Sequence, residues 1–126
     1  MKAKTFILTG GVLNTIMTLF HILLCLQIAE IYGAEPVYPL LQMFSVSGTI
    51  MIFFFAYTSL FYSKELTAGR TGKSIILFNI AIYGVRALGE FLLFPAVNWM
   101  IVGLCGVMVV IYSLAIMEGN REKSAA

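Results

Sequence analysis

Three ionisable side chains lie inside long apolar runs of the sequence: His21, Arg86 and Glu90. Arg86 and Glu90 are four residues apart, so on a helix they share one face and can form an ion pair. Histidine titrates near neutral pH and can also contact a ligand. An ionisable residue within a membrane is costly and commonly marks a functional site. We therefore predict that these three residues bind a ligand or exchange protons.

Each of these residues also has a structural interpretation, which the sequence leaves open. A buried ion pair often fails to recover the cost of desolvating its two charges, but it can fix the register of packed helices. A lone histidine on a packed helix face can be a hydrogen-bonded core residue, and burial lowers its pKa while a neighbouring carboxylate raises it.

Depth along the helices suggests which polar residues surround the site. At a helix rise of about 1.5 Å per residue, Glu90, Arg86 and His21 lie roughly 6 to 12 Å below the same end of their spans. The other half of the spans holds only neutral polar residues. We expect a pocket that opens toward the first end and is closed toward the second. The residues predicted at its rim are Gln42, Ser45 and Asn98.

The overall composition is that of a membrane protein. The chain has 126 residues, of which 60% are hydrophobic and 11% are charged. A soluble domain carries about a quarter charged residues, and its large surface needs them. This composition excludes an ordinary soluble globule, a disordered chain and a nucleic-acid-binding domain.

Four apolar runs are each long enough to cross a bilayer, which requires about 20 residues. Proline residues interrupt helices and mark the loops between these runs, at positions 36, 39 and 95. We predict a single all-α domain, an antiparallel four-helix transmembrane bundle over residues 1–126. The expected spans are about 5–28, 40–62, 74–94 and 98–117, with a polar loop at 63–73.

Basic residues predict the orientation of the bundle. Seven of the eight basic residues fall in the N-terminal segment, the middle loop and the C-terminal tail, which four spans place on one side. Because basic loops stay in the cytoplasm, we expect both termini inside, in a bacterial inner membrane. The seven residues are Lys2, Lys4, Lys64, Arg70, Lys73, Arg121 and Lys123.

Each expected span carries a stripe of polar or small residues at spacings of three and four, which places them on one helix face. These stripes should face inward, where small and hydroxyl side chains let helices pack closely and form weak interhelical hydrogen bonds. The clearest stripes are Gly11, Asn14, Thr18, His21, Cys25 in the first span and Asn79, Tyr83, Arg86, Glu90 in the third.

The sequence lacks the residues that several kinds of catalytic or metal site require. The single histidine does not suit bis-histidine haem, and the cysteines and histidine do not form a zinc set. No glycine-rich phosphate loop or Gly-x-Ser-x-Gly elbow is present. We therefore predict no metal and no cofactor.

The leading hypothesis is a small integral membrane protein whose outward-facing polar pocket binds a small molecule or ion, as a transporter or transporter subunit. Four helices rarely enclose a transport pathway, so we expect a homodimer or a larger membrane partner, and no nucleic acid. Two alternatives stay open. One is a non-catalytic accessory, assembly or immunity-type subunit, and the other is a membrane-embedded enzyme acting on a lipid or quinone.

Overall fold

The secondary structure is helical from end to end. The structure is a computed structural model that describes residues 2–125. Its elements are α1 (Lys2–Tyr32), α2 (Tyr38–Phe61), α3 (Ser63–Ala68), α4 (Arg70–Leu93) and α5 (Trp99–Ser124). The four long helices are each long and apolar enough to cross a membrane. The predicted all-α fold with four candidate spans is confirmed.

The helix boundaries differ from the expected spans in two places. α1 and α5 begin or end well outside 5–28 and 98–117, because a helix can continue past the apolar stretch that lies in the hydrocarbon. The expected loop at 63–73 is largely helical, since it contains α3 and the first turn of α4. Leu66 buries its side chain in this segment. Gly69, in an extended conformation, separates the two helices.

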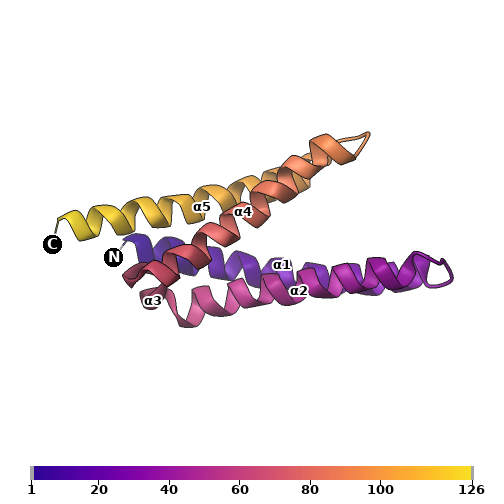
Figure 1. Cartoon of the computed structure of the whole chain (residues 1–126), viewed down its shortest axis with the longest axis horizontal. Coiled ribbons are helices and arrows are strands. Elements are labelled where there is room, and N and C mark those ends of the chain that lie inside the picture. The colour runs from indigo at the N-terminus through magenta and orange to yellow at the C-terminus, as the bar shows by residue number, and fades with distance from the viewer. Residues whose placement is uncertain (1, 126) are drawn as a thin grey trace.

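The helices form two antiparallel hairpins, α1–α2 and α4–α5, joined mainly through packing of α1 on α5. The loop at 94–98 is as short as the sequence predicted for an antiparallel pair. The hairpins lie close together at the end that holds α3 and both chain ends, which we call the terminal end (Figure 1). They diverge toward the loops at 33–37 and 94–98, which we call the loop end (Figure 1).

Hydrogen bonds tie the chain together at the terminal end. The backbone N–H of Lys2 donates to Glu122 Oε1 at 2.9 Å. The Lys123 ammonium donates to the carbonyl of Ala68 at 2.7 Å. The three basic segments therefore share one end of the bundle, as the four-span arrangement requires. That this end faces the cytoplasm stays a prediction from the charge distribution.

The core is concentrated in the terminal half of the bundle, and close helix contacts there depend on glycine. A Cβ atom on Gly10 would lie 2.6 Å from Tyr112 Cζ, so only glycine leaves room for that ring. A Cβ on Gly72 would lie 2.5 Å from Leu66 Cα, where α3 rests on α4. The buried cluster consists of Ile7, Leu66, Ile76, Tyr83, Cys105, Met108, Tyr112 and Ala115.

Candidate functional site

A cavity of about 250 Å³ lies between the two hairpins, above the core on the side of the loop end. All four long helices contribute to its walls, which are mostly apolar. The lining residues are Met17, Phe20, His21 and Leu24 of α1, Gly48, Met51 and Ile52 of α2, Ile82, Tyr83 and Arg86 of α4, and Ile101 and Cys105 of α5.

Two of the predicted site residues, His21 and Arg86, line this cavity from opposite hairpins. His21 Nδ1 is buried and has no hydrogen-bond partner among residues 2–125. Its ring lies over Gly48, where an added Cβ would be 4.0 Å from Nδ1. The Arg86 side chain is 44% exposed, and its guanidinium carbon lies 5.8 Å from the Phe94 ring centroid, within range of a cation–π interaction.

Glu90 belongs to a different set of contacts, at the turn between α4 and α5. Its carboxylate is only 3% exposed and lies 2.5 Å from Arg86 Nη1. The second carboxylate oxygen accepts the backbone N–H of Asn98 at 3.1 Å. The Asn98 side chain in turn caps α5, accepting from the N–H groups of Met100 at 3.1 Å and Ile101 at 3.3 Å. Glu90 thus fixes the turn and orients Arg86, and it does not line the cavity.

The residues predicted at the rim lie outside the cavity lining. Ser45 Oγ contacts Cys25 Sγ at 3.0 Å, and Thr49 Oγ1 contacts the same sulfur at 3.5 Å. These contacts join α1 to α2 within one hairpin. Gln42 Oε1 is buried and has no partner among the described residues, while Asn98 serves as the cap of α5.

The sequence did not single out a buried hydrogen-bond network below the cavity, in which each long helix supplies a side chain. Asn14 Nδ2 donates to the Tyr112 hydroxyl at 2.8 Å, and the Tyr83 hydroxyl donates to Asn14 Oδ1 at 2.5 Å. Ser59 and Tyr112 hydroxyls hydrogen-bond at 2.7 Å. The inward stripes of the first and third spans contained Asn14 and Tyr83. Spacing along single helices carried no information about which stripes meet.

The cavity therefore offers one guanidinium and one imidazole within apolar walls. Within residues 2–125, no group of three or more His, Cys, Asp or Glu residues is arranged to hold a metal ion. Both cysteines are free thiols. No family model matches the chain, and no curated protein or solved structure matches it either.

Proposed function

We propose that this membrane protein binds a small molecule with an anionic group and an apolar body in the cavity between the hairpins. The observation that carries the proposal is that Arg86 and His21 line one apolar cavity from opposite hairpins. Arginine has five N–H donors, and the ion pair with Glu90 is made through Nη1. The other donors, together with His21 Nδ1, are available to a ligand.

The size and position of the cavity restrict which ligands can bind. A volume of about 250 Å³ lies below the roughly 300–1,000 Å³ of sites for drug-sized ligands, so the group held there is small. The cavity lies on the side of the loop end, where the hairpins diverge (Figure 1). The charge distribution predicts that this end is outside, which supports uptake or export of the bound molecule, alone or with a partner subunit.

Benzoate is a suitable probe because it combines a carboxylate with an apolar ring, and benzyl alcohol is its uncharged analogue. With the protein in phosphatidylcholine nanodiscs, we expect benzoate to raise the unfolding temperature saturably and benzyl alcohol to have no such effect. The Arg86→Gln variant should lower benzoate affinity about tenfold or more, because hydrogen bonds to charged groups are strong.

Two further variants separate binding from folding. Glu90→Gln removes the charge that pairs with Arg86 and should strengthen benzoate binding, whereas a purely structural ion pair predicts no gain. Gly48→Leu should fill the space beneath His21 and abolish the shift. Gly103→Leu is its matched control, because nothing lies within 4 Å of a Cβ at Gly103. Equal benzoate shifts in all four variants and the wild type would contradict the proposal.

A further inference from the structure

One side of the bundle is open between α3 and the loop end. α1 packs on α2 and on α5, and α4 packs on α5, but α2 and α4 barely approach each other. Figure 1 shows the two helices separating further toward the loop end. In a membrane this seam between α2 and α4 faces the hydrocarbon directly.

The seam is a row of hollows that share lining residues. The cavity has Ile82 and Arg86 in common with a neighbouring hollow, an open surface depression whose lining residues all belong to α4. That hollow shares Phe78 with a third one, which is also lined by Phe54 and Phe55 of α2. We call the row of hollows from Arg86 down to Thr71 the seam groove.

The residues that α4 presents to the seam groove form one continuous face. Phe78, Ala81, Ile82, Val85 and Arg86 line the middle hollow. They follow the spacing i, i+3, i+4, i+7, i+8, which is a single helical stripe. Along this stripe the only charged residue is Arg86, and it stands at the loop-end limit of the groove beside the cavity.

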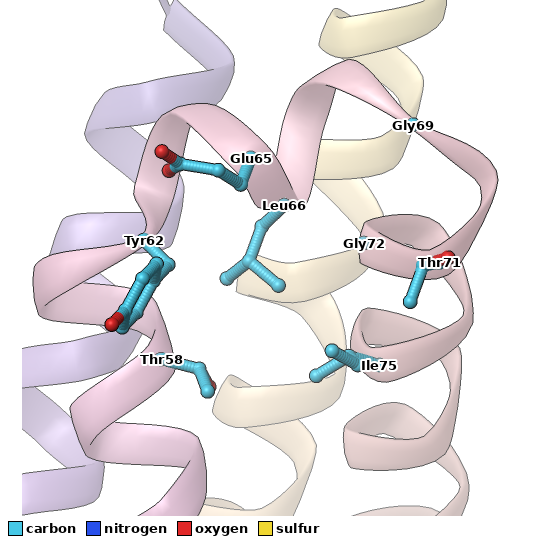
Figure 2. Close-up of a pocket in the computed structure, with 8 residues that line it drawn as sticks. All are labelled: Thr58, Tyr62, Glu65, Leu66, Gly69, Thr71, Gly72 and Ile75. Carbon is cyan, nitrogen blue, oxygen red and sulfur yellow. The ribbon is translucent and has the colours of Figure 1, made fainter.

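α3 closes the seam groove at the terminal end. The last hollow shares Thr71 and Ile75 with the one before it. Figure 2 shows this hollow between α2 and α4, with Leu66 of α3 directed into it. Leu66 is buried, so the end wall is a packed apolar side chain.

The groove is therefore long and apolar, with a cation at one end and a wall at the other. From Arg86 to Thr71 it follows α4 for about 22 Å, at a rise of about 1.5 Å per residue. This length exceeds the hydrocarbon layer of one bilayer leaflet, which is about 15 Å thick, half of the full core. A long flexible chain can occupy such a row, whereas a compact molecule would fill only one hollow.

We propose that the seam groove holds the hydrocarbon chain of a long-chain carboxylate that enters from the bilayer between α2 and α4. Its head group lies in the cavity, where the planar guanidinium of Arg86 matches the geometry of a carboxylate. A single chain fits because the hollows follow one another in one row. The proposal rests on the proposed function, since the cavity supplies the head-group site.

The test uses hexadecanoate probes that carry a photoreactive diazirine, in phosphatidylcholine nanodiscs, with labelled residues mapped by mass spectrometry. A diazirine on the last carbon should label the far part of the groove, near Phe54, Ile75 and Phe78. A diazirine next to the carboxylate should label residues around the cavity. Unlabelled hexadecanoate should compete with both probes, and hexadecanol should not.

A substitution in the groove separates the chain site from the head-group site. Ala81→Trp places a bulky ring across the middle hollow and should reduce tail-probe labelling about tenfold, while leaving the benzoate shift unchanged. Leu77→Trp is the matched control on the same helix, because Leu77 is exposed and lies outside the groove lining.

The possible outcomes are distinguishable. Tail labels confined to the groove and lost in Ala81→Trp support the proposal. Tail labels spread evenly over the apolar faces of all four long helices, alongside a normal benzoate shift, would mean bulk lipid only and would overturn the groove while the cavity site stands. If benzoate does not shift the unfolding temperature of the wild type, both the cavity site and the groove proposal are refuted.

Discussion

Tyr112 shows how a few polar residues organise this bundle. Its hydroxyl hydrogen-bonds with Asn14 of α1 and Ser59 of α2, and Asn14 accepts from Tyr83 of α4. In a membrane, burial of apolar surface does not drive helices together, because lipid tails are equally apolar. Hydrogen bonds and close packing therefore decide which faces meet, and this network selects one arrangement of all four long helices.

We expect Tyr112→Phe to lower the free energy of unfolding by about 1–3 kcal/mol, because Asn14 Nδ2 and the Ser59 hydroxyl each lose the buried partner that the Tyr112 hydroxyl provides. Unfolding by sodium dodecyl sulfate in mixed micelles measures this. Thr15→Ala is the control, since within residues 2–125 the Thr15 hydroxyl bonds only the Gly11 carbonyl of its own helix. Equal stability of Tyr112→Phe and the control would show that the network does not hold the helices together.

The short helix α3 was not evident from the composition of its segment. Its sequence is polar apart from Leu66 and Ala68, yet it packs on the start of α4 through Leu66. Contact between the two segments is close because residue 72 is glycine. α3 therefore positions the end wall of the seam groove (Figure 2).

A methyl group at Gly72 should displace α3, because its Cβ would lie 2.5 Å from the Glu65 carbonyl oxygen and from Leu66 Cα. We expect Gly72→Ala to cost about 1–3 kcal/mol through overpacking and to make residues 63–69 more sensitive to protease. Gly84→Ala on the same helix is the control. It meets nothing within 4 Å and should stabilise the helix by up to about 1 kcal/mol. Equal protease sensitivity of the two variants would contradict the packing described.

At the scale of the whole molecule, two hairpins converge at the terminal end and diverge at the loop end. The network and the apolar core occupy the converging half, and the cavity occupies the diverging half. This asymmetry is what gives His21 and Arg86 a shared space. A bundle packed equally along its length would close the gap between them.

The orientation in the membrane can be tested with single cysteines at Glu35 and Gly69, in a Cys25→Ser, Cys105→Ala background. α2 separates the two sites by about 36 Å at a rise of about 1.5 Å per residue, more than the hydrocarbon core of about 30 Å. In sealed inside-out vesicles of bacterial inner membrane, an impermeant maleimide should reach Gly69→Cys at once and Glu35→Cys only after permeabilisation. Labelling of both from the same side would refute the four-span topology.

The sequence by itself determined the all-α architecture, the four candidate spans and the inward stripes. These follow from local properties: twenty-residue apolar runs, proline positions and the period of the helix. It also identified His21, Arg86 and Glu90, because charged groups are rare within apolar runs. The helix at 63–68 was missed, since its stability depends on packing against α4, which local composition does not encode.

Only the tertiary structure decided which residues face each other. Periodicity fixes the face that a side chain occupies on its own helix and leaves open the neighbouring helix that this face meets. The structure places His21 with Arg86 in the cavity and turns Glu90 toward Asn98. Ser45 contacts Cys25 within the α1–α2 hairpin, and α2 and α4 barely approach each other. The physical reason is that contacts between helices depend on how the helices pack in three dimensions and on the close approach that glycine allows. The sequence of a single span does not specify either.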